Sequence, residues 1–266
     1  MVKKYFTAAA LAVIILSLSC SKPAEKDIFV CAEKGDIAGM KLLLEKGTNI
    51  NKVNPANYSI LFVAITNGDV EAVKFLISKG ANLSNRIVNT TPLMLAAECN
   101  QTQIIVLLAD KGVKLDDSNG IRTALICAAE KGNLDAVKAL TEKGADINLK
   151  NNLNWTALMF AVKYDRIDIV KYLISKKADL NAGDYFDDKT ALIIAVENGN
   201  PDMVKLLINN GAEINQPMKD TSGKKMMYYT PLDVAQKKGL KKIADLLIGK
   251  GAVSSTMDFD TESKTE

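Results

Sequence analysis

The chain repeats a unit of about 33 residues seven times, and this repetition constrains its fold more than any other feature. Two columns of mostly glycine lie 12 residues apart in every copy. The first column is Gly35, Gly68, Asn100, Gly132, Asp165, Gly199 and Gly239, and the second is Gly47, Gly80, Gly112, Gly144, Lys177, Gly211 and Gly251. Because the offset holds in all copies, chance similarity within an ordinary helical bundle is a poor explanation.

The residues before the second column predict a helix. Leucine stands four residues before that column in every copy, and an apolar residue stands three residues earlier still. Apolar residues at this spacing lie on one face of a helix. The glycine that follows suits a left-handed residue ending the helix. Lys177 occupies this place in the fifth copy, where a left-handed backbone costs roughly 1 kcal/mol.

A second helix is predicted before the first column. It carries a column of small residues, and a serine or threonine stands at its start, where the hydroxyl can cap free backbone N–H groups. The small residues are Cys31, Ala64, Ala96, Ala128, Ala161, Ala195 and Ala235, and the capping residues are Ser59, Thr91, Thr123, Thr156, Thr190 and Thr230. One such helix pair cannot bury its own apolar face, so we expect the pairs to stack into a solenoid.

The segments TPLMLAAE, GDVEAVKFLISKGANL and GNLDAVKALTEKGADIN resemble ankyrin repeats. The resemblance extends over about residues 26–252. It implies an all-α ankyrin-repeat solenoid of about seven helix-turn-helix repeats with projecting β-hairpin-like loops, and a protein that binds other proteins without catalysing a reaction.

Two departures from the family pattern concern the loop and the start of the first helix. Ankyrin repeats usually have a histidine three residues after the capping threonine, and the two residues form a hydrogen bond. Here that position holds Met94, Ile126, Met159, Ile193 or Asp233, which puts the stability of the local turn in question. The usual glycine before the threonine is mostly asparagine, at Asn57, Asn89 and Asn154. Asparagine tolerates positive φ better than most residues, so the turn can survive. Gly120 takes this role beside Ile121.

The first 20 residues, MVKKYFTAAALAVIILSLSC, resemble a bacterial lipoprotein signal. Two lysines precede an apolar run that is shorter than the ~20 residues needed to span a bilayer. We therefore predict a signal peptide over residues 1–19, lipidation of Cys20, and a short linker over residues 20–25. Plain secretion and an uncleaved anchor are the alternatives. The prediction places the protein in the bacterial cell envelope, on the periplasmic side or at the outer membrane.

The C-terminal part of the chain holds an insertion and a polar tail. The insertion near residues 216–229 is basic and rich in methionine, so it is either a contact arm or a tolerated loop. Residues 253–266 lack the helix-pair pattern, and we expect a disordered tail, with an acidic docking segment as the alternative. The lysines of the seventh copy suit the polar outside of a terminal cap.

Charge and composition argue against catalysis and nucleic-acid binding. The chain has 34 Lys and Arg against 31 Asp and Glu, and removing residues 1–19 takes away two lysines, so no strongly basic field remains. Histidine is absent, and we find no nucleotide-binding or nucleophile motif. The carboxylates Glu33, Glu98, Glu130 and Glu197 recur at one repeat position, which is typical of a solvated helix face. We therefore expect no enzyme activity, metal or cofactor.

The three cysteines after Cys20 are predicted to remain reduced. Cys31 fills the small-residue column, so it is expected to be a buried small side chain. Cys99 and Cys127 lie in adjacent copies on helices expected to be ~8–10 Å apart. A disulfide needs Cα atoms within about 7 Å.

The variable positions are the candidates for partner binding. One variable column lies just before each capping residue, and the family resemblance places it on loops that line a concave face. Tyr, Trp and Arg dominate interface energetics. The predicted partner-binding residues are Tyr58, Arg122, Trp155, Lys189 and Tyr229 from this column, with Tyr164 from the adjacent helix. The alternative is that the aromatic residues only pack against neighbouring loops.

Together these features predict a protein–protein interaction scaffold tethered to the envelope by lipid on Cys20. It is expected to be a monomer that binds another protein, with the membrane as its second partner and no nucleic acid. Two alternatives remain open. One is a dedicated inhibitor or protector of an envelope enzyme, and the other is a structural envelope protein that binds wall or membrane.

Overall fold

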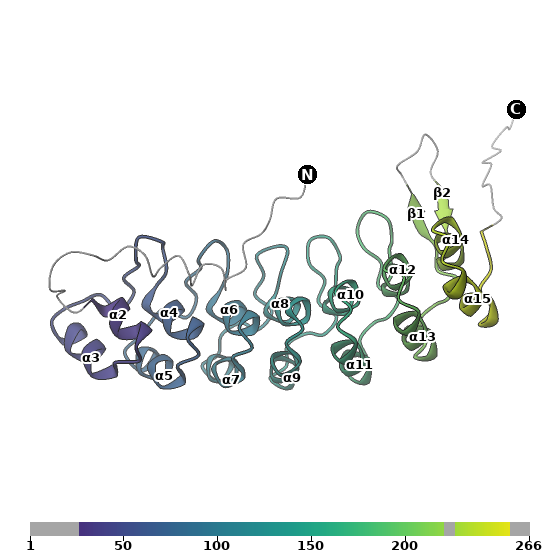
Figure 1. Ribbon diagram of the computed structural model, residues 1–266. Helices are drawn as coiled ribbons and strands as arrows, with labels where there is room; N and C mark the ends of the chain where they lie inside the picture. The colour runs from purple at the N-terminus through teal and green to yellow at the C-terminus, as the bar shows by residue number, and fades with distance from the viewer. Residues whose placement is uncertain (1–26, 221–226, 256–266) are drawn as a thin grey trace, which may run out of the picture.

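A computed structural model describes residues 27–220 and 227–255. The predicted signal peptide, Cys20 and the linker lie outside these residues. Figure 1 shows helix pairs stacked side by side in one row, with a loop rising from the same side of each junction between pairs. The row curves gently toward that side. Within the described part of the chain, no helix has the length and apolar character needed to cross a membrane.

Each repeat contributes an inner helix beside the loops and an outer helix behind it. The inner helices are α2 (Ile28–Glu33), α4 (Ile60–Thr66), α6 (Pro92–Glu98), α8 (Ala124–Lys131), α10 (Ala157–Lys163), α12 (Ala191–Glu197) and α14 (Pro231–Lys237). The outer helices are α3 (Ile37–Glu45), α5 (Val70–Ser78), α7 (Thr102–Asp110), α9 (Leu134–Glu142), α11 (Ile167–Ser175), α13 (Pro201–Asn209) and α15 (Lys241–Gly249). This arrangement confirms the predicted all-α solenoid.

The inner helices begin where the sequence predicts. From α4 onward, the serine or threonine N-cap accepts a hydrogen bond from the backbone N–H three residues later. Pro92 and Pro231 occupy the first turn, where a missing N–H is tolerated.

Left-handed residues join the helices. All seven residues of the first column and all seven of the second have positive φ. Lys177 keeps this conformation with φ of 63° although it has a side chain. Asn57, Asn89 and Asn154 are also left-handed, and Gly120 adopts φ of 89° next to Ile121, as predicted.

The residues that replace the family histidine are used in two ways. Met94, Ile126, Met159 and Ile193 are buried in the core, so packing takes the place of the absent hydrogen bond. Asp233 instead completes a capping box, in which its carboxylate accepts from the Thr230 N–H and its own N–H donates to the Thr230 hydroxyl.

The core runs through the middle of the row. The alanines of the small-residue column are fully buried, which lets successive inner helices approach closely. On the outer helices, the leucine column is fully buried from Leu76 to Leu247, whereas Leu43 in the first repeat is only partly buried. Each repeat therefore covers the apolar face of the one before it.

Side chains also connect neighbouring repeats. An Asn or Asp oxygen after one repeat accepts a hydrogen bond from a backbone N–H of the next, in the pairs Asn51–Asn82, Asp116–Asp146, Asn148–Asp179 and Asn181–Glu213. A second set of bonds reaches the carbonyl oxygens at the ends of inner helices, from Asn67, Asn133, Arg166, Asn198 and Lys238. These carbonyls have no partner within their own helix.

The predicted insertion forms a hairpin. Strands β1 (Met218–Asp220) and β2 (Met227–Tyr229) pair antiparallel, with Met218 opposite Tyr229. The Lys219 N–H donates to the Asp187 carbonyl of the preceding loop at 2.7 Å, so the hairpin extends the row of loops. Residues 221–226 lie outside the described part of the chain.

The end of the described chain folds back onto the seventh repeat. The Val253 N–H donates to Asn215 Oδ1, and the hydroxyls of Ser254 and Ser255 donate to Asp233. Residues 253–255 belong to the segment predicted as a disordered tail, and Asn215 and the Asp233 carboxylate hold them against the seventh repeat. The rest of the predicted tail, residues 256–266, lies outside the described residues.

Candidate partner-binding face

The loops on the concave side are closed by a shared device. In four of them, the side-chain oxygen of an Asn or Asp accepts a hydrogen bond from the backbone N–H of the variable residue before the capping residue. The backbone N–H of the same Asn or Asp donates to the backbone carbonyl of that variable residue. The closed pairs are Asn54–Tyr58, Asn119–Arg122, Asn151–Trp155 and Asp184–Lys189. The backbone of these predicted partner-binding residues is therefore fixed.

Their side chains are fixed as well, in most cases by the residue eight positions later. The loop residue and the end of the following inner helix form four contacts: Arg122–Glu130, Trp155–Lys163, Lys189–Glu197 and Tyr229–Lys237. Ion pairs alternate with cation–π contacts along the row. We call these four contacts the eight-residue pairs.

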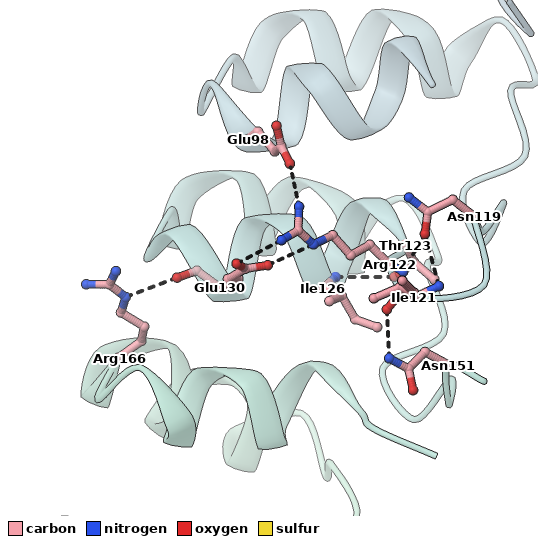
Figure 2. A network of polar contacts seen from close by, with 9 residues as sticks. All are labelled: Glu98, Asn119, Ile121, Arg122, Thr123, Ile126, Glu130, Asn151 and Arg166. Atoms are coloured by element: carbon pink, nitrogen blue, oxygen red, sulfur yellow. Dashed lines mark hydrogen bonds and ion pairs between the residues drawn. The ribbon is translucent and has the colours of Figure 1, made fainter. Parts of the chain in front are cut away.

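Arg122 forms the most buried of these pairs. Its Nη2 donates to Glu130 Oε1 at 3.1 Å, and its Nε lies 3.0 Å from Glu130 Oε2. Its Nη1 lies 3.5 Å from Glu98 Oε1 in the preceding repeat. Figure 2 shows the guanidinium between the two carboxylates and Arg166 donating to the Glu130 carbonyl. Arg122 thus links helices α6 and α8.

This network corrects one expectation. The side chains of Glu98 and Glu130 are only 14% and 13% exposed, against 31% for Arg122, so they do not form a solvated face. Glu130 Oε2 is fully buried, and it is held by the ion pair with Nε rather than by an aligned hydrogen bond. Half-buried carboxylates require a compensating cation, and Arg122 supplies it.

The same carboxylates influence nearby groups. Burial and, secondarily, the charge of Glu98 raise the pKa of the Cys99 thiol, and burial raises the pKa of Cys127 still further. Burial and the charge of Glu98 also raise the pKa of Tyr58. Both thiols therefore stay protonated and unreactive. Within the described part of the chain, Cys31, Cys99 and Cys127 form no disulfide.

The fifth repeat presents an aromatic group beside this network. Lys163 Nζ lies 5.0 Å from the centroid of the Trp155 ring and 5.6 Å from that of Tyr164. Trp155 also packs edge-on against Phe160, at 5.2 Å between ring centroids. Cation–π contacts of this kind orient the ammonium group without neutralising it.

Two further pairs complete the row. Lys189 Nζ lies 3.3 Å from Glu197 and 3.6 Å from Asp187, and in the last repeat Lys237 Nζ lies 4.4 Å from the centroid of Tyr229. Attraction to Glu197 and Asp187 raises the pKa of Lys189 against the opposing effect of burial, which is the largest single influence. Lys189 therefore keeps its charge.

The structure thus places all six predicted residues along one side of the row, each near a helix end or loop. Tyr164 is exposed, whereas Tyr58, Trp155 and Tyr229 are partly buried and pack on the core. Contact with a partner and packing against neighbouring loops are both compatible with these positions, so the partner-binding role stays a prediction.

Sequence reasoning missed a row of exposed apolar residues at the loop tips. Val88 is 90% exposed, Tyr185 and Phe186 are 67% and 62% exposed, and Ile121 and Leu153 are also exposed. Bonds between loops hold the tips in register: the Ile121 carbonyl accepts from Asn151 Nδ2, and the Leu153 carbonyl accepts from the Tyr185 N–H. The available signal was an apolar residue within a polar loop, recurring at nearly the repeat spacing.

Among residues 27–220 and 227–255, no group of three or more Cys, Asp and Glu side chains is arranged to hold a metal ion. The face offers hydrogen-bonding groups, aromatic edges and cations, which are the chemical means of recognising a protein surface.

Comparisons with known proteins agree with this architecture. The family model for ankyrin repeats (three copies) matches residues 28–119, 114–184 and 182–258. Among solved structures, the human ASB11 ankyrin repeat domain is 24% identical, with 85% of this chain and 98% of that chain covered and a TM-score of 0.70. The ankyrin repeat domain of Bcl-3, a member of the IkappaB family, is 28% identical, with 73% and 86% covered and a TM-score of 0.64. The comparison with curated proteins gives no match.

Proposed function

Because the chain belongs to the ankyrin repeat family, whose repeats generally mediate protein–protein interaction, we propose that it is a non-enzymatic scaffold that holds a partner protein against its concave face. That face consists of the eight-residue pairs, Tyr164 and the apolar loop tips. We further propose that lipid on Cys20 tethers the scaffold to a bacterial cell envelope.

The eight-residue pairs are the observation that carries the proposal. Four variable loop residues are already ordered by a closed backbone loop, and three of these, together with Tyr229, are also ordered by a side-chain partner. A surface that is ordered before binding loses little conformational entropy when a partner docks. The loop tips add exposed apolar side chains held in register, and contiguous exposed apolar surface often marks an interaction site.

The proposed face can be tested by cross-linked affinity capture from the native envelope. The baits are the parent chain and the variant Trp155→Ala with Tyr164→Ala. We expect the variant to lose the partner, because it removes two central aromatic side chains and leaves the buried Arg122 network intact. A matched control is Leu42→Ala with Ile248→Ala, which removes exposed apolar side chains from outer helices. Equal recovery with all three baits would contradict the assignment of the face.

The tether is tested separately. Mass spectrometry of the purified native protein should find an acylated N-terminal Cys20, and Cys20→Ser should release the chain from the membrane fraction. A mature protein that begins elsewhere, or an unmodified Cys20, would contradict the tether while leaving the protein-binding proposal in place.

A further inference from the structure

Three carboxylates at the ends of inner helices, Glu98, Glu130 and Glu197, are already paired within the chain. Arg122 lies between Glu98 and Glu130 and pairs with both, so the three groups together carry one net negative charge, and Lys189 pairs with Glu197. In each case the cation comes from a loop and the carboxylate from the end of an inner helix. These acidic side chains are therefore not available to attract a basic partner.

Cations at the centre of the same face are not neutralised in this way. Within the part of the chain that the structure describes, Lys131, Lys163 and Arg166 have no carboxylate at ion-pair distance. Lys163 and Arg166 are exposed, and Lys131 is partly exposed. Arg166 uses its Nε to bond the Glu130 carbonyl, while Figure 2 shows its two terminal nitrogens without a contact to the residues drawn. We call these three residues the central cations.

The central cations lie at or just after the ends of two adjacent inner helices, α8 and α10. Arg166 reaches the end of α8, where Lys131 is the last helical residue, and Lys163 and Tyr164 end helix α10 beside it. One exposed carboxylate, Asp165, lies on the same stretch, and it accepts a hydrogen bond from Asn200 of the next repeat. Counted together with the Arg122 network, four cations (Arg122, Lys131, Lys163 and Arg166) face three carboxylates (Glu98, Glu130 and Asp165), so a net charge of +1 remains on this patch.

Aromatic surface borders the patch. Trp155 and Tyr164 flank the Lys163 ammonium, which holds its charge in place. A bound partner would cover these exposed side chains and exclude water from them, and charge attraction is stronger in such surroundings than in open water.

We propose that this patch recognises an acidic segment of the partner protein, with Asp or Glu carboxylates placed between Lys163, Arg166 and Lys131 and an apolar residue against Trp155 and Tyr164. The inference rests on the proposed function, because it names the chemistry of that partner. The whole chain is nearly balanced in charge, with 34 basic and 31 acidic residues. A compact group of three cations therefore fits a short acidic segment better than the long phosphate track of a nucleic acid.

The test uses a library of random twelve-residue peptides displayed on phage, selected on the full-length chain held in detergent. We expect the selected peptides to hold more Asp and Glu than Lys and Arg. Their affinity should fall about tenfold or more on the double charge reversal Lys163→Glu with Arg166→Glu, since close charge pairs at an interface contribute strongly. It should also fall when the salt concentration is raised.

The matched control is Lys171→Glu with Lys205→Glu, which makes the same change in net charge on the exposed side of the outer helices α11 and α13. We expect it to leave the affinity unchanged, with circular dichroism showing both double variants to be folded. Equal losses in the two double variants would overturn the inference, because they would indicate a general effect of charge.

A third variant, Trp155→Ala, separates the inference from the proposed function. Suppose that the selected peptides no longer bind the Trp155→Ala variant, yet contain no excess of Asp and Glu and bind the Lys163→Glu, Arg166→Glu variant as well as the parent. This result would contradict recognition of an acidic segment and would still support the protein-binding face. Selected peptides that are indifferent to Trp155→Ala, or no enrichment over empty beads, would contradict the face itself.

Discussion

At the scale of single residues, some residues with a side chain adopt the positive φ that glycine adopts most easily. Lys177 stands in the second column with φ of 63°, and Val88 reaches φ of 46° at a loop tip. For a β-branched residue such a conformation is a clear outlier. The surrounding hydrogen bonds enforce it: the Lys177 N–H donates to Ile174, and Ile87 and Thr90 exchange two bonds across Val88. Each site therefore holds conformational strain.

Relieving that strain at Lys177 should stabilise the protein. We expect Lys177→Gly to raise the free energy of unfolding by about 0.5–1 kcal/mol, because glycine adopts positive φ without the steric cost of a Cβ. Urea unfolding followed by circular dichroism measures the change. The neighbouring variant Lys176→Gly is the control, since Lys176 has φ of −94° and should lose stability instead. Two variants of equal stability would refute this explanation.

Asp233 is a second residue whose ionisation contributes to the stability of the fold. Partial burial acts to raise its pKa, but hydrogen bonds from Ser254, Ser255 and Thr230 outweigh that effect and lower the pKa from 3.8 to about 2. A carboxyl group with a lowered folded-state pKa contributes stability above its unfolded pKa. That contribution is lost as the pH falls from about 4 toward 2.

The free energies of unfolding of the parent chain and of the Asp233→Asn variant should therefore become equal in acid. We expect the parent to be more stable by roughly 1 kcal/mol at pH 6, a value already reduced for solvent screening because the group is only partly buried. The difference should shrink toward zero near pH 2. The double variant Ser254→Ala with Ser255→Ala removes two of the donors, so it should reduce the pH-dependent difference. A difference that is constant with pH would exclude the ionised Asp233 as its source.

At the scale of helices and loops, much of the fold could be predicted from the sequence and part of the site could not. The glycine columns, the Thr caps and the alanine column each follow from local spacing, so the helix pairs and their order were predictable. The contact between Arg122 and Glu98 joins two repeats and depends on loop geometry that no local pattern specifies. The column before the capping residues was recognised as variable, but its contact with the residue eight positions later was not recognised.

The same limit applies to the carboxylates and to the first residues of the predicted tail. Glu130 belongs to a column of acids that is typical of a solvated face, and only the position of Arg122 shows that it is half-buried. Ser254 and Ser255 are ordinary tail residues by composition, and they are held because Asp233 lies within reach. Burial and tertiary hydrogen bonds decide such cases, and both are properties of the folded chain.

At the scale of the whole molecule, each repeat contacts mainly its neighbours, and the chain end imitates a further repeat. The Val253 N–H bonds Asn215 in the same way that Glu213 bonds Asn181 one repeat earlier. Residues 253–255 thus supply part of what an eighth repeat would supply. In a solenoid of this type, the loss of a terminal contact affects the adjacent units first.

Two truncations test this reading. A chain that ends at Ala252 should show amide hydrogen exchange in α14 and α15 faster by roughly tenfold, which corresponds to ~1.4 kcal/mol of opening free energy. Exchange in α4 to α10 should not change. A chain that ends at Ser255 keeps the contacts with Asp233 and should behave like the parent. Faster exchange spread evenly over the helices, or equal effects of both truncations, would contradict a local role for this segment.

The eight-residue pairs have a consequence for the way the sequence can change over generations. A mutation of Arg122 alone leaves Glu130 half-buried without its cation, whereas exchanging both residues, for instance for an aromatic residue and a lysine as at Trp155 and Lys163, gives another stable pair. Related sequences should therefore vary at these two positions in step. A change of binding specificity in such a family would therefore require paired substitutions on the concave face, while the helices that support that face stay the same.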